Sequence, residues 1–240
     1  MEFAHVKDIE IEDEESWYNK IFLTFDMEWA SNEVLSHILD KIRRYDIKVT
    51  FFCTHESPLL DEMRSDSRIE LGIHPNFNFL LNGDHRYGKS IDEVVSHWKK
   101  LIPEACSVRS HYVTNGALFY ESFSNHGLKY DCNYFLPQSS GIDARPWLNS
   151  SKNLVFVPVT WEDDDHCLYK HPFDAKRYIN YKGLKVFSFH PVTILLNIES
   201  IDRYYNSKPF YMDYKKLLTN RNPGAGVETF LEDLIREVKK

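Results

Sequence analysis

Short apolar runs rich in β-branched residues alternate with amphipathic stretches along the chain, and this pattern predicts strands and helices in turn. Six runs are typical of strands, at residues 20–25, 47–52, 69–73, 106–109, 154–160 and 184–189. Helical spacing of apolar residues and capping signals predict helices over 32–45, from Ser90 onward, over 116–126 and from Val227 to Lys240. Alternation of this kind favours a parallel sheet, either open or closed into a barrel.

The remaining segments do not indicate a second domain within residues 1–240. Residues 197–226 are polar and rich in tyrosine, and we expect a long excursion before the final helix. Residues 1–19 are acidic and lack the cationic region and apolar core of a signal peptide. We therefore expect a single domain.

Composition narrows the class of protein. The net charge is −7 with no basic block, which argues against nucleic acid or an anionic membrane as the main partner. No apolar run approaches the roughly 20 residues of a membrane span. We therefore expect no integral membrane segment. Four scattered cysteines without a CxxC motif indicate free thiols, so we expect a cytoplasmic protein.

The first strand runs into two acids, in the sequence LTFDMEW. Because side chains alternate across a strand, Asp26 and Glu28 should point to one side and Met27 to the other. Two neighbouring carboxylates repel each other unless a cation lies between them. The pair is therefore either a metal or acid–base site, or a solvated strand end.

Other strand ends carry residue types that are common in catalysis, and in parallel α/β folds such side chains gather at this edge. They are His55, His74 with Asn78, Arg109 with His111, and His190. Each has an ordinary alternative, such as a hydrogen-bonded core histidine or a surface arginine. Asp131 could be a turn residue, and the acidic run from Glu162 to His166 could be a solvated loop. Together they indicate one site.

Taken in order, these motifs resemble the polysaccharide deacetylases of carbohydrate esterase family four, which share the NodB-homology fold. More narrowly, they resemble the WbmS-like branch that is tied to bacterial surface-polysaccharide clusters. The similarity rests on LTFDMEW, VTFF, ELGIHPNFN, VRSHY, YDCN and FSFHP, between about residues 20 and 195. It implies an α/β fold, a distorted and incomplete (β/α) barrel of about seven strands.

The resemblance also implies catalytic roles. Asp26 would be the general base, and His190 would be the general acid that protonates the departing amine. Arg109 would orient Asp26, and Asp131 would tune the network of Arg109 and His190.

The same resemblance implies a divalent metal ion, and zinc is the metal that we expect. Its ligands would be Glu28, His74 and Asn78. Asn78 stands where the family has a histidine, and an amide oxygen should bind zinc less tightly than an imidazole. Three further histidines could complete the site instead, namely His55, His85 and His111, the last of which stands where the family has a proline. Substrate contacts are expected from His111, Tyr112, Trp161 and Glu162.

These expectations combine into a metal-dependent hydrolase that removes an N-acyl group, such as acetyl, from an amino sugar during surface-polysaccharide precursor biosynthesis. The substrate would be an N-acylated sugar in a nucleotide-linked or lipid-linked saccharide. Two alternatives stay open: a non-catalytic carbohydrate-binding or scaffold protein on a degenerate deacetylase fold, and a hydrolase of another acyl amide or ester.

Overall fold

Nine strands lie side by side in one curled sheet, in the order β7-β8-β6-β5-β4-β3-β2-β10-β9, and β1 pairs with β2. The computed structural model describes all of residues 1–240. The strands are β1 (Glu2–Phe3), β2 (Lys20–Asp26), β3 (Val49–Cys53), β4 (Ile69–Ile73), β5 (Ser107–Val108), β6 (Tyr130–Asp131), β7 (Trp147–Asn149), β8 (Leu154–Phe156), β9 (Trp161–Glu162) and β10 (Val186–Phe189). All neighbouring pairs are parallel except β7 with β8.

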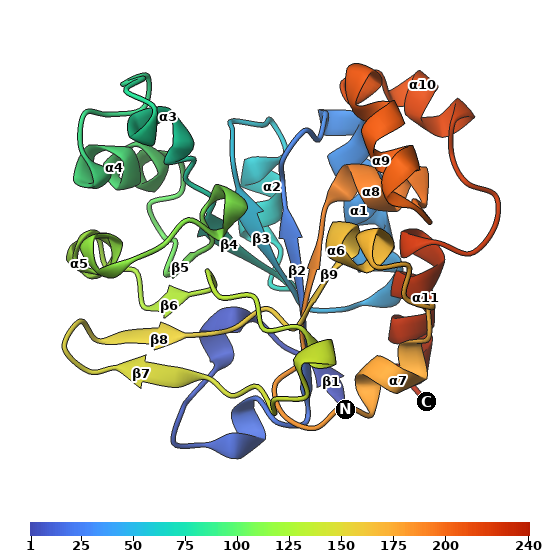
Figure 1. Cartoon of the computed structure of the whole chain (residues 1–240), viewed down its shortest axis with the longest axis horizontal. Helices are drawn as coiled ribbons and strands as arrows, with labels where there is room; N and C mark the ends of the chain where they lie inside the picture. The colour runs from blue at the N-terminus through green and yellow to red at the C-terminus, as the bar shows by residue number, and fades with distance from the viewer.

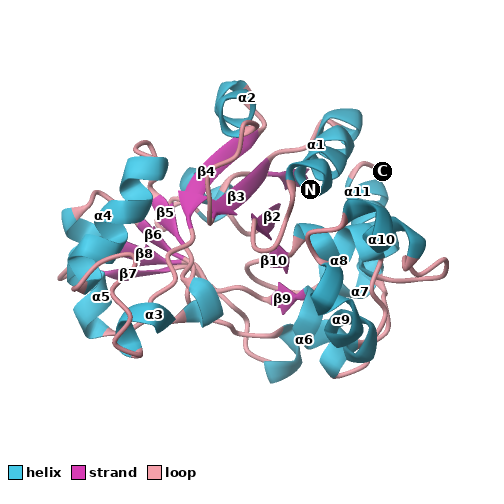
Figure 2. Cartoon of the chain, turned by 90° about the horizontal axis from the view of Figure 1, so that it is seen from above, coloured by secondary structure: helices cyan, strands magenta, loops and turns pink.

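The two ends of this strand order do not pair, so the sheet curls into a barrel that stays open between β9 and the β6–β8 side (Figure 2). The predicted incomplete (β/α) barrel is thus confirmed, with ten strands where about seven were expected. The additional strands are only two or three residues long, and such short pieces carry no periodic pattern that a sequence could reveal.

Helices cover the outside of the sheet (Figure 1). They are α1 (Asn32–Tyr45), α2 (Leu60–Ser65), α3 (Asn78–Leu81), α4 (Ile91–Leu101), α5 (Ala117–Asn125), α6 (Asp163–Leu168), α7 (Ala175–Ile179), α8 (Pro191–Leu196), α9 (Ile201–Ser207), α10 (Tyr214–Thr219) and α11 (Val227–Val238). The four predicted helices correspond to α1, α4, α5 and α11. At the start of α4, Ser90 Oγ accepts a hydrogen bond from the main-chain N–H of Glu93 (3.2 Å), as its capping motif predicted.

The apolar run 154–160, which was expected to be one strand, is divided in the structure. Strand β8 ends at Phe156, and the chain then crosses the open side of the barrel to β9 on the far edge of the sheet. Val157 and Val159 are buried along this crossing. The run is therefore apolar because it lines the interior, which a strand pattern cannot distinguish from strand residues.

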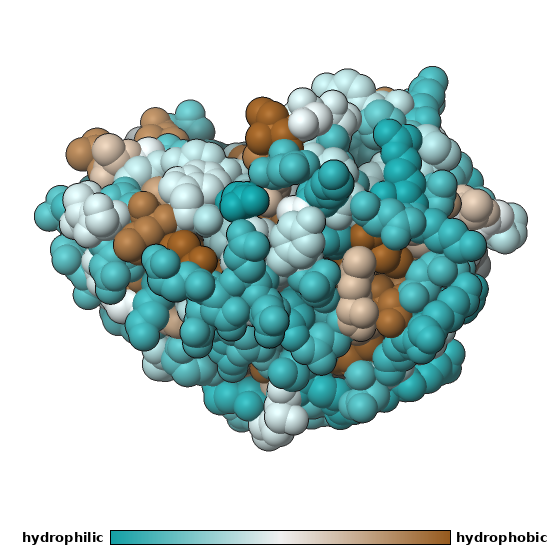
Figure 3. Space-filling view, turned by 90° about the horizontal axis from the view of Figure 1, so that it is seen from below, coloured by the Kyte–Doolittle hydropathy of each residue, from teal (hydrophilic) through white to brown (hydrophobic).

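The N-terminal segment closes the end of the barrel where the strands begin. Val6, Ile9 and Trp17 are buried in a second, smaller core with side chains of β2 and β3, such as Phe22 and Phe52. The face formed at this end is largely hydrophilic on its outside, with separate apolar patches (Figure 3). Because this end is plugged, the site must be sought at the carboxyl ends of the strands.

The excursion 197–226 folds into α9 and α10 beside α8, next to the carboxyl ends of the strands (Figure 1). Tyr204 and Tyr211 are buried there, and both rings contact Trp29 of the loop after β2. The excursion thus forms one wall beside the site. All four cysteines are free. None of the helices combines the length and the apolar character that crossing a membrane requires.

Candidate active site

A cavity of about 160 Å³ opens at the carboxyl ends of the strands. Its lining includes Asp26, Glu28, His74, Arg109, His111 and His190. These residues come from the ends of four different strands, as the sequence pattern predicted. Asp26 ends β2, His74 directly follows β4, Arg109 directly follows β5, and His190 directly follows β10.

The turn after β2 places its two acids together. Asp26 and Glu28 both line the cavity, whereas Met27 between them is fully buried in the main core. Trp29 then adopts a left-handed backbone conformation (φ 58°), which turns the chain away from the strand. The predicted alternation of the Asp-Met-Glu segment is confirmed.

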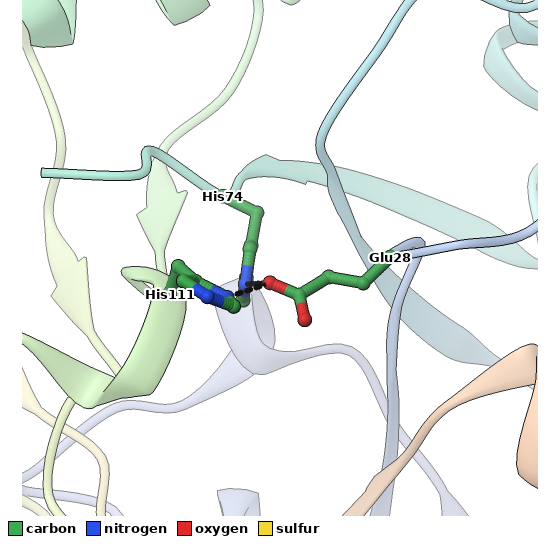
Figure 4. Close-up of side chains that lie close together, drawn as sticks. All are labelled: Glu28, His74 and His111. Carbon is green, nitrogen blue, oxygen red and sulfur yellow. Dashed lines mark hydrogen bonds and ion pairs between the residues drawn. The ribbon is translucent and has the colours of Figure 1, made fainter. Parts of the chain in front are cut away.

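Three side chains converge on one point, as Figure 4 shows. Glu28 Oε1 lies 2.7 Å from His74 Nε2, and His111 Nδ1 contacts the same oxygen. Their ligand atoms all lie within 4.8 Å of one another. One carboxylate and two imidazoles form a donor set that zinc takes in catalytic sites, where three protein ligands leave a position for water or substrate. The residues present therefore fit a divalent cation.

The charges at this point favour an ionised carboxylate. Burial by itself raises the pKa of Glu28, but the neighbouring His74 charge and the hydrogen bonds from His111 and His74 outweigh burial. The net pKa of Glu28 lies well below its ordinary value. Glu28 is thus an anionic ligand over the whole neutral range.

The family resemblance implied Asn78 as a metal ligand, but Asn78 does not line this cavity. Asn78 is the first residue of α3. The spacing His-x-x-x-Asn brings two side chains onto one face only within a helix, but this helix begins at Asn78 and leaves His74 outside it. Of the three alternative histidines, the structure brings His111 to Glu28 and His74, whereas His55 and His85 are not in this group.

Arg109 holds the second acid. Its guanidinium is buried, and Nη1 donates hydrogen bonds to Asp26 Oδ1 (2.9 Å), Thr24 Oγ1 (2.8 Å) and Ser188 Oγ (3.0 Å). The guanidinium carbon also lies 4.4 Å from the ring centre of Phe52. These contacts fix the Asp26 carboxylate at the edge of the cavity.

His190 is held by Asp163, a partner that the sequence analysis did not single out. Asp163 is fully buried at the start of α6; Oδ1 lies 2.8 Å from His190 Nδ1, and Oδ2 accepts a hydrogen bond from the His190 main-chain N–H (2.7 Å). With Nδ1 engaged, Nε2 remains available to the cavity. Trp29 stacks on the imidazole with ring centres 5.5 Å apart.

The His190 imidazole is tuned towards its cationic form. Burial lowers its pKa, but the charge and the hydrogen bond of Asp163 and the nearby carboxylates of Asp164 and Asp26 outweigh burial. The net pKa of His190 lies well above its ordinary value. A protonated imidazole facing the cavity is suited to donate a proton.

Asp131 has a different position from the one expected. It is fully buried, does not line the cavity and makes no hydrogen bond to Arg109 or His190. Its Oδ1 accepts hydrogen bonds from the main chain (2.9 Å) and side chain (2.7 Å) of Asn133, whose Oδ1 accepts from the main chain of Ser110 (2.6 Å). Burial raises the pKa of Asp131 to about 7. Asp131 thus supports the loop that carries His111.

Only some of the residues expected to contact the substrate line the cavity. Tyr112 and Glu162 line the cavity, together with His111. Trp161 does not, because its ring is buried against Phe189 and Phe230 and its Nε1 donates to His166. Burial and the nearby charge of Asp164 raise the pKa of Glu162 to about 8. Burial and the charge of Asp163 raise the pKa of Asp164, which also lines the cavity.

Comparison with known proteins shows the family to which the chain belongs. The chain matches a family model described as WbmS-like polysaccharide deacetylase over residues 23–208, well over half of its length. A crystal structure of a candidate polysaccharide deacetylase involved in O-antigen biosynthesis, from Bordetella bronchiseptica, is 39% identical to it, with a TM-score of 0.92 and 98% of each chain covered. No curated protein sequence matches the chain.

Two more distant structures are also similar. A family 4 carbohydrate esterase from Streptomyces lividans is 10% identical, with a TM-score of 0.46 over 85% of this chain and 87% of that chain. A polysaccharide deacetylase from Bacillus cereus is 16% identical, with a TM-score of 0.40 over 87% of this chain and 93% of that chain. Scores this low add no argument. The family model and the Bordetella structure suffice, and the chain belongs to the WbmS-like family of polysaccharide deacetylases.

Proposed function

We propose that the chain is a divalent-metal-dependent hydrolase that removes an N-acyl group, such as acetyl, from an amino sugar. The Bordetella relative is described as involved in O-antigen biosynthesis, and we propose the same setting, a bacterial surface polysaccharide, for this chain. One observation carries the proposal. Three metal-ligating atoms, a carboxylate held by arginine and a histidine held by aspartate all face one cavity.

Glu28, His74 and His111 would hold the cation, with zinc the first candidate for this donor set. Such an ion, when bound, polarises an acyl carbonyl and lowers the pKa of a neighbouring water. His111 replaces Asn78 in the ligand set that we propose. This exchange supplies the second imidazole that the family has at the position of Asn78.

The residues around this point divide the proton transfers between them. Asp26, oriented by Arg109, accepts the proton of the attacking water, and a tetrahedral intermediate forms at the acyl carbon. His190, kept cationic by Asp163, donates its proton to the amide nitrogen as the C–N bond breaks. Acetate and an amino sugar leave. Stacking of Trp29 on His190 holds the donor in place and shields it from water.

The test is acetate release by purified protein loaded with one equivalent of zinc, with N-acetylated amino sugars as substrates. We expect turnover that a chelator abolishes and that added zinc restores. Asp26→Asn should bind zinc as the wild type does and release acetate about 10³-fold more slowly. A fully loaded wild-type protein that hydrolyses no N-acyl sugar across a panel of substrates would contradict the proposal.

A further inference from the structure

A second and larger cavity, of about 680 Å³, adjoins the reacting one. The two share three lining residues, Trp29, His111 and Tyr112. The smaller cavity holds all the reacting groups. A substrate that places its acyl group there has room beyond Tyr112 for a substantial further part of the molecule.

The larger cavity differs in charge from the reacting one. Four acidic residues line the reacting cavity, Asp26, Glu28, Glu162 and Asp164, and its two cations, Arg109 and His190, are already paired with Asp26 and Asp163. The larger cavity has two lysines, Lys208 and Lys216, and a single acid, Asp213. In a chain of net charge −7, this cationic wall is the part of the cleft suited to an anion.

The lysines are presented by the excursion after α8. Lys208 lies over two rings, with Nζ 4.7 Å from the centre of Tyr204 and 4.8 Å from that of Tyr205, so its side chain is directed by cation–π contacts. Lys216 Nζ is 3.5 Å from the carboxylate of Asp213. Asp213 offsets part of the positive charge, and two lysines with one acid leave this wall with a net positive charge.

The rest of the wall is apolar or aromatic. Pro209, Phe210 and Met212 line it, and Met212 and Tyr112 are largely exposed, at 73% and 76%. Tyr112 has a left-handed backbone (φ 55°), and so do Val113 (φ 46°) and Trp29 (φ 58°). Non-glycine residues in this region are strained, and such strain concentrates where a protein clamps a ligand. The strained turn presents the Tyr112 ring at the boundary of the two cavities.

We infer that the larger cavity binds a phosphate or diphosphate group attached to the sugar, with Lys208 and Lys216 on the phosphate oxygens. The inference rests on the proposed function for the sugar, and it narrows the substrate to an activated N-acyl sugar rather than a neutral polymer. Tyr112 and Phe210 then contact the group beyond the phosphates. That group is a nucleoside or a lipid, and the test distinguishes these two sources.

The experiment is calorimetric titration of chelator-treated full-length protein, so that phosphate oxygens cannot bind to the metal. The probes are inorganic pyrophosphate, uridine diphosphate and farnesyl diphosphate, each at two salt concentrations. The double variant Lys208→Gln/Lys216→Gln removes both charges. Lys215→Gln is the matched control, because Lys215 is exposed on α10, the helix that carries Lys216, and does not line the cavity. Lys208→Arg preserves the charge.

We expect saturable binding of uridine diphosphate or farnesyl diphosphate, weakened about tenfold in the double variant and unchanged in Lys215→Gln. Lys208→Arg should stay within about threefold of the wild type. Preference for the nucleotide or for the farnesyl probe identifies the source of the phosphate. Absence of binding by all three probes, or an equal loss in Lys215→Gln, overturns the inference.

The binding result is independent of turnover. Acetate release from a free N-acetyl amino sugar without diphosphate binding would refute this inference alone. Diphosphate binding without acetate release from any substrate would refute the proposed function alone.

Discussion

Two buried glutamates at opposite ends of the barrel show how differently the same side chain can be used. Glu70, on β4 near the plugged end, is 2% exposed, and Glu28 at the open end is 8% exposed. Glu70 accepts hydrogen bonds from Ser107 Oγ (2.8 Å), Thr50 Oγ1 (2.8 Å) and the main-chain N–H of Lys7 (3.0 Å). Through these neutral donors, Glu70 connects the N-terminal segment with β3, β4 and β5, so its role is to stabilise the fold.

Glu28 has partners of another kind. Two histidines place ring nitrogens against it, and all three residues line a cavity that is open to solvent. A carboxylate surrounded by hydroxyls and main-chain N–H groups has no need of a cation, whereas one that shares its oxygen with two imidazoles offers a ligand set. Burial does not distinguish the two glutamates, but the nature of their partners does.

The largest expected effect at the open end follows from Asp26→Asn. The substitution preserves shape but removes the proton acceptor, so kcat for acetate release should fall about 10³-fold, within the usual contribution of a general base. The thermal midpoint and zinc stoichiometry should change little. A loss of less than tenfold would show that another group accepts the proton.

The second effect, on zinc affinity, distinguishes His111 from Asn78 as the third metal ligand. His111→Ala should weaken zinc binding about 100-fold or more, because it removes one of the three ligand atoms. Asn78→Ala should leave zinc affinity within about threefold of the wild type, since Asn78 does not line the cavity. Zinc titration against a competing chelator measures both. The reverse pattern would restore Asn78 as the ligand.

The third effect is a shift in pH dependence. Asp163 raises the pKa of His190, so the imidazole of the wild type stays protonated to higher pH. Asp163→Asn removes that charge, and the alkaline limb of kcat/KM should move to lower pH. Asp165→Asn, whose carboxylate does not contact His190, is the control and should keep the wild-type profile. An unshifted limb in Asp163→Asn would exclude His190 as the acid.

The same pKa shift has a consequence for stability. Because the pKa of His190 is higher in the folded than in the unfolded chain, the stabilisation from the Asp163–His190 pair is complete below about pH 6.5. It is lost as the pH rises through the folded pKa. Denaturant titrations at several pH values should show this loss in the wild type and little of it in Asp163→Asn.

The smallest effect on activity is expected at the plugged end. Glu70→Gln should lower the free energy of unfolding by about 1–3 kcal/mol, because hydrogen-bonded partners of the carboxylate are left unsatisfied. Activity per folded molecule should match the wild type, unlike that of Glu28→Gln. If Glu70→Gln lost both zinc and activity while still folded, the distinction between the two ends would be wrong.

The sequence predicts the residues that line the cavity wherever they lie directly at strand ends. Alternation along one strand suffices for Asp26 and Glu28, and the position after a buried strand suffices for His74, Arg109 and His190. Strand ends are fixed by local pattern, and a parallel sheet brings them to one edge.

Residues that depend on a turn or on tertiary burial could not be predicted this way. His111 was one of three alternative histidines, and no spacing rule reveals that it, and not His55 or His85, meets Glu28 and His74. In the sequence, Asp163 is one of several acids that could all be solvated. In the structure, Glu162 pairs with Ser188 in parallel register, and this pairing brings the next residue, Asp163, into contact with His190. The same limit applies to the N-terminal segment, residues 1–19. Its sequence is acidic overall, and the pattern does not reveal that Val6, Ile9 and Trp17 are buried in the core.

The central claim is that Glu28, His74 and His111 hold one divalent cation. Anomalous scattering from a crystal grown with zinc, recorded above and below the zinc absorption edge, tests it most directly. We expect a single strong peak in bonding contact with Glu28 Oε1, His74 Nε2 and His111 Nδ1, with Asp26 and His190 beside it. A peak coordinated by Asn78 in place of His111, or no peak in this cavity, would contradict it.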